Sequence, residues 1–376
     1  MGFDASALPV FPWDLLEPYK RQAQACPDGL IDLSVGTPVD PTPTALQEAL
    51  CQAANAPGYP ATIGTEDLRC SIVNHYAQHR AVPDLPVTGV LPTIGSKEIV
   101  AQLPSLLGLG EGDAVVHPAV AYPTYDIGAR LAGATPVPAD SPSQLPSDLT
   151  GRVKLVWLNS PSNPSGLVAS VEEMAVWVDW ARSNGAVVAS DECYAALAWD
   201  EPWASNGVPS ILDRRVRGDS LDGVLALYSL SKQSNAAGYR AAWLAGDPSL
   251  LGRIAGLRKH MGMMMPGPVQ AAMVAALADQ SSVESQRKVY ARRRRVLADG
   301  IGQAGYLIEG SQAGLYLWFT TPDRQDCWQT VADLASLGLL VAPGAFYGEA
   351  GRAHARMALT ASDQTVAEAR ARLIGL

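Results

Sequence analysis

A lysine set between two serines gives the strongest chemical signal in this chain. Lys232 lies in the polar stretch 228–240, which separates the apolar runs 223–227 and 241–245. Burial penalises the ammonium form of a lysine, so a buried lysine loses its proton readily and can attack carbonyl carbons to form Schiff bases. The serines and Arg240 are groups that bind phosphate. We therefore predict that Lys232 carries an aldehyde cofactor with a phosphate tail. The plain alternative is a solvated loop lysine among turn serines.

Two further polar residues follow strand-like segments. Asn163 comes shortly after the apolar run 154–159, and Asp191 ends the run 186–190. In parallel sheets ligands gather at the carboxyl ends of the strands. Asn163, Asp191 and Lys232 are therefore predicted to converge on one crevice.

Two glycine-containing turns offer further ligand contacts. Gly95 and Ser96 open a predicted helix, whose first N–H groups could bind an anion, although a serine N-cap is an equally common explanation. Gly36 lies in the turn-rich segment 33–40, where glycine permits close approach of the backbone to a ligand. An ordinary loop is the alternative there.

The elements that would position these residues alternate between strands and helices. Strand-like runs include 113–117, 154–159 and 186–190, and helical patterns include 43–55, 65–80 and 122–132. Ser170 and Glu173 form a capping-box pattern for a helix that runs to about residue 184. The alternation predicts an α/β fold: a mostly parallel sheet with helices on both faces.

Beyond residue 266 the pattern changes. The expected helices are 268–278, 283–303 and 364–374, and the expected strands are 315–319, 338–342 and 355–359. We predict a large domain over residues 36–265, with residues 1–35 and 266–376 forming an N-terminal arm and a smaller α+β domain. Residues 1–35 carry little periodicity. Methionines 261–265 are interpreted as packing residues and not as a metal site.

Composition excludes several classes of protein. The 376 residues carry a net charge of -9, which argues against general binding to nucleic acid or to anionic membranes. The basic run 292–295 is interpreted as a solvated or interface face of a helix. The five cysteines show no metal or disulfide spacing, and no apolar run is long enough to span a membrane. With no signal peptide evident, the expectation is a soluble, cytoplasmic protein without a bound metal.

The order of these landmarks resembles that of the class I/II aminotransferases, pyridoxal-phosphate enzymes of fold type I, along nearly the whole chain. The matching positions are Gly36, Tyr59, Gly95, Ser96, Lys97, Tyr122, Asn163, Asp191, Tyr194, Ser229, Lys232, Arg240 and Arg356. The resemblance implies the cofactor pyridoxal 5'-phosphate and a fold type I architecture.

The resemblance also implies a role for each position around the cofactor ring. Lys232 would form the internal aldimine and act as general base, and Asp191 would keep the pyridine nitrogen protonated. Tyr194 and Asn163 would hydrogen-bond the phenolic oxygen of the ring, and Tyr122 would stack on the ring face. Taken singly, Asp191 could be a helix cap and Tyr122 a core aromatic.

The other positions concern phosphate, substrate and partner. The implied phosphate clamp is made of Gly95, Ser96, Lys97, Ser229 and Arg240. Arg356, with Gly36 and Asn163, would bind substrate, and the arginine would hold its α-carboxylate as a bidentate fork. Tyr59 would reach the phosphate of a neighbouring subunit, which implies a homodimer with active sites at the interface. The plain alternative for Arg356 is a surface arginine.

Two positions depart from the family pattern: Ala242, where many members have glycine, and Ser234, where an aromatic is frequent. The segments 11–20, 32–43 and 229–240 look like those of N-succinyldiaminopimelate aminotransferases of lysine biosynthesis. That likeness implies transfer of an amino group from glutamate to N-succinyl-2-amino-6-ketopimelate. Aspartate or aromatic aminotransferases, a β-lyase and a ligand-sensing regulator are the alternatives left open.

Overall fold

The computed structural model describes residues 8–375, and its larger part is built on a seven-stranded sheet. The strand order is β2-β8-β7-β6-β5-β3-β4. The bounds are β2 Val90–Ile94, β3 Ala114–His117, β4 Thr135–Pro138, β5 Val153–Asn159, β6 Val187–Asp191, β7 Val224–Ser229 and β8 Ala241–Gly246. Only β8 runs antiparallel to its two neighbours, so the mostly parallel sheet and the α/β class are confirmed.

The register of the sheet brings the predicted polar residues to one edge. Asn159 is paired with Asp191, and Asp191 with Leu227, so β5, β6 and β7 end together. Strand β8 is antiparallel and pairs Ala242 with Ser229, so β8 begins at the edge where β7 ends. Arg240 directly precedes β8, which explains why this arginine lies beside the end of β7.

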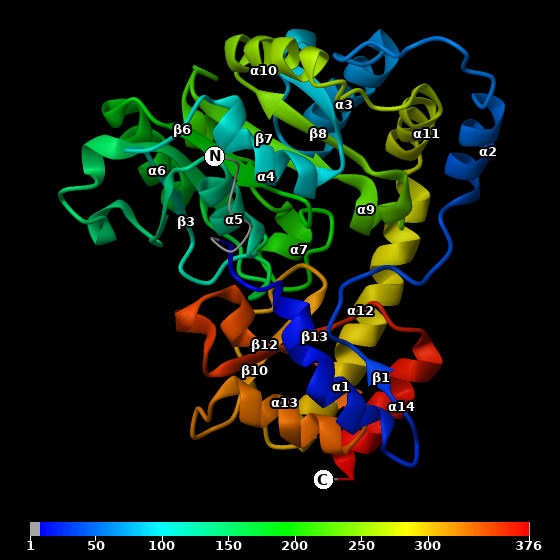
Figure 1. The fold of residues 1–376 in the computed structure, drawn as a ribbon. Helices are drawn as coiled ribbons and strands as arrows, with labels where there is room; N and C mark the ends of the chain where they lie inside the picture. The colour runs from blue at the N-terminus through cyan, green and yellow to red at the C-terminus, as the bar shows by residue number, and fades with distance from the viewer. Residues whose placement is uncertain (1–7, 376) are drawn as a thin grey trace.

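Helices cover the sheet on both faces (Figure 1). The helices of this larger part are α2 Thr44–Gln52, α3 Glu66–His79, α4 Ser96–Leu106, α5 Thr124–Leu131, α6 Val171–Asn184, α7 Trp203–Asn206, α8 Arg214–Arg217, α9 Leu230–Gln233, α10 Pro248–His260 and α11 Gly267–Ala278. The predicted capping box is present: the Ser170 hydroxyl accepts from the Glu173 amide, and the Glu173 carboxylate accepts from the Ser170 amide. The strands carry the apolar runs seen in the sequence, so the core lies on both sides of the sheet.

A smaller part lies below the first and is joined to it by a long helix (Figure 1). Its four-stranded antiparallel sheet has the order β12-β13-β10-β9, and a two-stranded parallel pair is formed by β1 and β11. The bounds are α12 Gln280–Gln303, α13 Cys327–Ser336, α14 Asp363–Ile374, β1 Ile31–Asp32, β9 Leu307–Ile308, β10 Tyr316–Thr320, β11 Leu339–Leu340, β12 Ala342–Pro343 and β13 His354–Ala358. It has a hydrophobic core of its own.

The N-terminal arm contains more structure than its sequence predicts. A 3-10 turn, Pro12–Leu16, leads directly into helix α1, Glu17–Gln24, which packs on α13. Tyr19 stacks on Trp328 with ring centroids 5.5 Å apart, so tertiary packing stabilises a helix too short to be stable alone. Residues 1–7 of the predicted arm lie outside the described residues. The predicted division at residue 266 stays a prediction, and α11 packs on α2 and α3 of the larger part.

The basic run 292–295 is used for ion pairs between segments that are distant in sequence. Arg293 is almost fully buried and pairs with Asp40 and Asp363, at 2.6 and 2.7 Å. Arg294 pairs with Asp200 at 3.1 Å. A solvated or interface face is predicted for this run; at Arg293 the structure shows an internal contact, because its guanidinium joins α12 to the loop before α2 and to α14.

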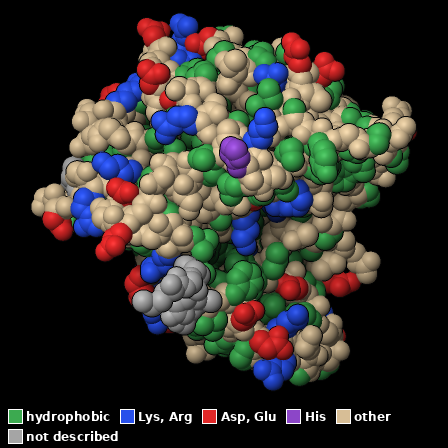
Figure 2. All heavy atoms as spheres, turned by 45° about the horizontal axis from the view of Figure 1, so that its top comes forward, with side chains coloured by type: hydrophobic (Ala, Val, Ile, Leu, Met, Phe, Trp, Pro, Cys, Tyr) green, Lys and Arg blue, Asp and Glu red, His purple; other side chains and the backbone are tan. Residues whose placement is uncertain are grey.

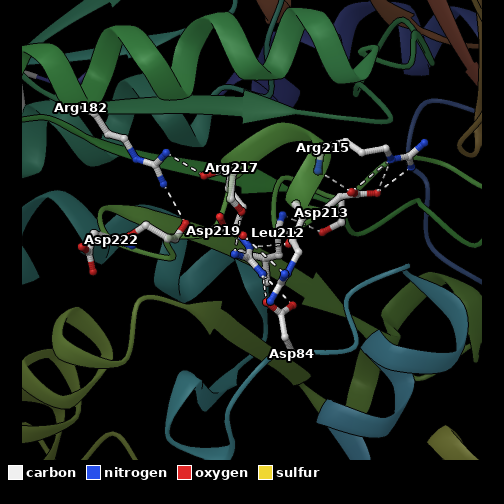
Figure 3. A network of polar contacts seen from close by, with 12 residues as sticks. Asp84, Arg182, Leu212, Asp213, Arg215, Arg217, Asp219 and Asp222 are labelled. Carbon is white, nitrogen blue, oxygen red and sulfur yellow. Dashed lines mark hydrogen bonds and ion pairs between the residues drawn. The ribbon is translucent and has the colours of Figure 1, made fainter.

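A polar network holds the segment that leads into β7 (Figure 3). The buried Arg217 donates to both carboxylate oxygens of Asp84, each at 2.7 Å, and to the Leu212 carbonyl, also at 2.7 Å. Arg182 of α6 donates to the Arg217 carbonyl at 2.7 Å. Arg215 pairs with Asp213 at 2.6 Å. These contacts tie α6, α8 and the loop before β2 together.

Candidate active site

A cavity of about 520 Å³ lies at the edge where β5, β6 and β7 end, between the larger and smaller parts. Figure 2 shows hydrophobic and basic side chains at the hollow between these two parts. The residues predicted as site residues that line the cavity are Gly36, Ser96, Lys97, Tyr122, Asn163, Asp191, Tyr194, Ser229, Lys232, Arg240 and Arg356. The structure therefore brings most of the predicted set together. Gly95 adjoins the cavity, and Tyr59 does not line it.

Lys232 lies on α9, the single turn that follows β7, and points its amine at the carbonyl of Gly36, to which it donates a hydrogen bond. Burial is the main cause that lowers the pKa of Lys232, and the positive charge of Arg356 lowers it further. A lowered pKa increases the share of neutral amine, which is the nucleophilic and basic form. The local geometry therefore suits the predicted Schiff-base chemistry.

Gly36 has no room for a side chain. A Cβ at this position would overlap the hydroxyl oxygen of Tyr316. Any larger residue at this position would have to displace the Tyr316 ring.

Asp191 is a buried carboxyl with two hydrogen-bond donors and, within the described residues, no cation bonded to it. Tyr125 donates to its Oδ2 at 2.9 Å, and the Cys193 amide donates to Oδ1 at 3.2 Å. Burial raises the pKa of Asp191, and the two donors lower it only in part. A cation placed against this carboxyl would favour its ionised form. This carboxyl is therefore suited to bind a cation such as the protonated ring nitrogen of the predicted cofactor.

Asn159, the last residue of β5, holds the backbone around Asp191. Its amide nitrogen donates to the Asp191 carbonyl at 3.0 Å, and its Oδ1 accepts from the Asn163 amide at 2.8 Å. One side chain thus fixes both predicted polar positions relative to each other. Asn163 in turn accepts a 2.9 Å hydrogen bond from Arg356.

The corner of the cavity near α4 has the composition of an anion site. Gly95, with φ of 76°, is the N-cap of α4, and a Cβ there would overlap the guanidinium of Arg240. Ser229 and Ser231 lie with their hydroxyl oxygens 2.9 Å apart on the other side of the same corner. Backbone N–H groups at a helix start, two hydroxyls and an arginine together fit a phosphate.

Arg356 is buried, so the alternative of a surface arginine is wrong. It is 2% exposed, and its guanidinium carbon lies 3.9 Å from the ring centroid of Tyr316 and 5.0 Å from that of Tyr347. It donates to Asn163 and, at 2.5 Å, to the Ser34 carbonyl. Its Nε has no hydrogen-bond partner within residues 8–375. A buried guanidinium with a free donor and no carboxylate is suited to bind one from a substrate.

The phenol groups of Tyr194 and Tyr316 face each other, with 3.2 Å between the two oxygens. Burial would raise the pKa of Tyr316, but the positive charges of Arg356 and Lys232 outweigh it and lower that pKa. Burial raises the pKa of Tyr194. The pair can therefore share or pass a proton beside the lysine.

The three remaining predicted residues are Tyr122, Lys97 and Tyr59, and of these only Tyr59 lies away from the cavity. Tyr122 lines the cavity and meets Tyr125 edge to face at 6.1 Å. Lys97 is exposed at the rim, where its amine lies 5.7 Å from the ring centroid of Phe11. Tyr59 is 95% exposed on the loop between α2 and α3. An exposed aromatic of that size suits contact with a second chain.

Sequence reasoning missed several residues of the site. They are Tyr125, Asn159, Cys193, Ser231, Tyr316 and Trp13. Asn159 and Ser231 carry a detectable signal, since each is polar at the end of a strand or next to the reactive lysine. Tyr125 and Tyr316 carry none, because a tyrosine within an apolar pattern is usually part of the core.

The cavity fits pyridoxal phosphate in three separate respects. It offers a buried carboxyl without a cation, a phosphate corner and an amine of lowered pKa, and all three lie in the same 520 Å³ space. Within residues 8–375 there is no cluster of potential metal ligands, and none of the helices there is long and apolar enough to cross a membrane.

Comparison with known proteins agrees with this geometry. The family model described as aminotransferase class I and II matches residues 28–373. The chain is 52% identical to the 4-dedimethylamino-4-oxo-anhydrotetracycline transaminase OxyQ of Streptomyces rimosus, over 97% of this chain and 99% of that protein. It is 51% identical to a probable aminotransferase of Mycobacterium tuberculosis, over 99% of this chain and 87% of that protein.

More distant relatives have other names. The LL-diaminopimelate aminotransferase of Aquifex aeolicus is 32% identical over 92% of this chain and 91% of that protein. Of the solved structures, a probable N-succinyldiaminopimelate aminotransferase from Thermus thermophilus superposes with a TM-score of 0.85 at 27% identity, over 97% of this chain and all of that one (100%).

Proposed function

The chain belongs to the class I and II aminotransferases, which are pyridoxal-phosphate enzymes, and we propose that it transfers an amino group from glutamate to a keto substrate with Lys232 as the reacting residue. The observation that carries this proposal is the position of Lys232. Its amine has a lowered pKa and lies in the same cavity as Asp191, Arg356 and the phosphate corner.

The cofactor would be held by residues at three points. Asp191 would bind the ring nitrogen, the group of Gly95, Ser96, Ser229 and Arg240 would bind the phosphate, and Lys232 would hold the cofactor between turnovers. Lys97 is proposed as a weaker contact at the rim. When bound, pyridoxal phosphate supplies the electron sink that stabilises the negative charge left after the α-proton departs.

The protein's own residues would do the rest. Arg356 binds the α-carboxylate of the amino acid, and Asn163 keeps the guanidinium in place. With the α-carbon fixed, the neutral amine of Lys232 would act as the base that takes the α-proton and holds it at Nζ. Tyr194 and Asn163 would hold the phenolic oxygen of the ring, and Tyr122 would cover its face. The keto substrate then reverses the sequence in a second half reaction.

The keto substrate has two candidates. The sequence predicts N-succinyl-2-amino-6-ketopimelate, and the diaminopimelate aminotransferases at about 30% identity favour a substrate of that type. The relative at 52% identity favours a second candidate, because its name specifies a ketone on the anhydrotetracycline skeleton. In both cases glutamate is the proposed amino donor.

A homodimer is proposed as the active form. Class I and II aminotransferases are typically dimers, and the exposed Tyr59 would contact the phosphate of the second subunit. A cytoplasmic location stays a prediction from the sequence.

The test of the proposed function is the first half reaction. We expect the purified protein to bind pyridoxal phosphate with a characteristic absorbance, and glutamate to convert that absorbance. Lys232→Ala should lose both the attached-cofactor absorbance and turnover. Transamination retained by Lys232→Ala would contradict the assignment. A panel of keto acids that includes the succinylated one would then rank the acceptors.

A further inference from the structure

A second cavity, of about 570 Å³, opens next to the central one. The two cavities share four lining residues: Phe11, Trp13, Lys97 and Tyr122. The walls of the second cavity come from the N-terminal arm, from the start of α5 and from the segment 345–348. We call this cavity the side chamber. It is not part of the cofactor site described above.

The side chamber is walled mainly by apolar and aromatic groups. Trp13 packs against Phe346 with ring centroids 5.5 Å apart, and against Phe11 at 5.7 Å. Ile127 adds an aliphatic wall from α5. The Phe11 ring is 53% exposed, so apolar surface there is left without a partner within the described chain. A flat apolar group entering the chamber would remove this surface from water and stack on rings.

The chamber lies beside the group proposed to hold the substrate carboxylate. Tyr347 lines the chamber, and the guanidinium carbon of Arg356 lies 5.0 Å from its ring centroid. Tyr122 faces both cavities from the other side. A substrate whose carboxylate is bound by Arg356 can therefore extend its remaining part past these two rings into the chamber.

The chamber offers little to a second carboxylate. Its charged or titratable lining residues, within the part of the chain that the structure describes, are Lys97, His117 and Asp126, besides Tyr122 and Tyr347. Burial lowers the pKa of His117, so this imidazole is neutral at neutral pH. Asp126 repels an anion and is paired with Arg130 outside the chamber, at 2.6 Å. Lys97 is a cation at the rim and lies over the Phe11 ring. A carboxylate deep in such a chamber would be desolvated without a bonded partner, which is costly.

We propose that the side chamber receives the body of the keto substrate, and that this body is an uncharged group containing a ring and not a chain that ends in a carboxylate. The inference rests on the proposed aminotransfer and names the substrate class of that site. Glutamate is compatible with it, because only the bulkier keto substrate has to enter the chamber.

The test uses the enzyme after glutamate has converted it to the amino form. Phenylpyruvate and 2-oxopimelate are then compared as acceptors in single-turnover absorbance experiments. Both compounds are α-keto acids. Phenylpyruvate carries an aromatic ring at its other end, whereas 2-oxopimelate carries a second carboxylate there. We expect kcat/KM for phenylpyruvate to be at least ten times the kcat/KM for 2-oxopimelate.

A charge placed in the chamber should reverse this preference. Ile127 is half-buried on α5, so Ile127→Arg is expected to fold, to lower kcat/KM for phenylpyruvate about tenfold and to raise that for 2-oxopimelate. Leu131→Arg is the matched control. It makes the same change one turn further along α5, at a residue that is 42% exposed and outside the chamber lining. Its acceptor preference should equal that of the wild type.

Three outcomes would overturn the inference. The first is a wild-type preference for 2-oxopimelate. The second is an Ile127→Arg variant with unchanged acceptor ratio. The third is an Ile127→Arg variant that changes only the sedimentation of the protein, since a second copy of the chain would then fill the chamber. Failure of the glutamate half reaction itself would instead contradict the proposed function, so the two failures are distinguishable.

Discussion

The phenol of Tyr125 donates a 2.9 Å hydrogen bond to Oδ2 of Asp191 and so connects the end of strand β6 to helix α5. This bond favours the ionised carboxylate, and it opposes the effect of burial, which raises the pKa of Asp191. The cost of burying the ionised carboxylate of Asp191 is therefore partly offset before any ligand binds.

Tyr125→Phe removes that donor without changing the ring. A hydrogen bond to a charged group contributes about 1.5–3 kcal/mol, so we expect the affinity for pyridoxal phosphate to fall roughly tenfold or more. The pKa of Asp191 should rise further, and tight binding should therefore begin at a higher pH than in the wild type. Spectroscopic titration of cofactor binding across pH measures both effects. Tyr306→Phe, in the smaller part, should change neither.

Arg356→Lys keeps the charge but loses the planar fork. Loss of one charge-assisted hydrogen bond corresponds to a decrease of about 10- to 100-fold in kcat/KM for the amino acid. The absorbance of the bound cofactor should be retained, because Arg356 is assigned to the substrate. Arg352→Lys, at a nearby position whose side chain is 53% exposed, serves as control. Unchanged kcat/KM in Arg356→Lys would contradict the assignment.

Lys232 should destabilise the cofactor-free protein in a pH-dependent way. Burial lowers its pKa from the ordinary value of 10.5. The unfolded chain therefore binds the proton more tightly than the folded one, so this group costs stability at low pH. The cost shrinks as pH rises through the lowered pKa and vanishes above 10.5.

Lys232→Met is the corresponding variant. The free energy of unfolding of this variant, measured in urea without cofactor, should exceed that of the wild type most at pH values below the lowered pKa, and this gain should disappear toward pH 10.5. Lys288→Met, at a less buried lysine on α12, controls for the loss of a charge. A gain that does not vary with pH would contradict a lowered pKa for Lys232.

The buried pair Arg80–Glu192 should be the most sensitive ion pair in the larger part. The side chains are 4% and 0% exposed and lie 2.7 Å apart, and Glu192 also accepts from the Ile211 amide. Arg80→Met leaves a buried carboxylate without its cation, which we expect to cost about 3–5 kcal/mol. Arg130→Met breaks the exposed pair with Asp126 and should cost about 0.3–0.5 kcal/mol. Urea unfolding compares the two, and equal losses would show that burial is not the cause.

Mixed dimers test the proposed role of Tyr59. If Tyr59 completes the phosphate site of the other subunit, Tyr59→Phe should weaken cofactor binding about tenfold. A heterodimer of one Lys232→Ala and one Tyr59→Phe subunit would then contain one site with both native residues. Half of its sites should bind cofactor with wild-type affinity, and its turnover at limiting cofactor should be half that of the wild type. No recovery would place Tyr59 in the site of its own subunit, and a Tyr59→Phe homodimer with wild-type cofactor affinity would place Tyr59 outside any site.

Much of this arrangement could be predicted because parallel strands end at one edge. Asn163, Asp191 and Lys232 each follow an apolar run, and β5, β6 and β7 do end together. The capping box at Ser170 was equally predictable, since its two hydrogen bonds are local. Predictions of this kind depend only on neighbours in sequence and on sheet topology.

The residues that could not be predicted depend on contacts between distant elements. Tyr125 has the sequence pattern of a core residue of α5, and only the packing of that helix on the sheet brings its hydroxyl to Asp191. Helix α1 has a proline in its first turn and few residues, and it is stabilised by Tyr19 stacking on Trp328. Arg293 resembles its exposed neighbours in the basic run until the loop containing Asp40 folds over it.

Two adjacent acids with opposite surroundings stand at the end of strand β6. Asp191 faces the cavity without a cation, while Glu192 faces the other side and already holds Arg80. Because successive side chains of a strand point to opposite faces, a shift of β6 by one residue would exchange the two carboxylates. Glu192 would then face the cavity, away from Arg80, and Arg80 would be buried without a carboxylate partner. The pair thus selects the strand register: only the native alignment gives Arg80 its carboxylate and leaves the other carboxylate free for chemistry.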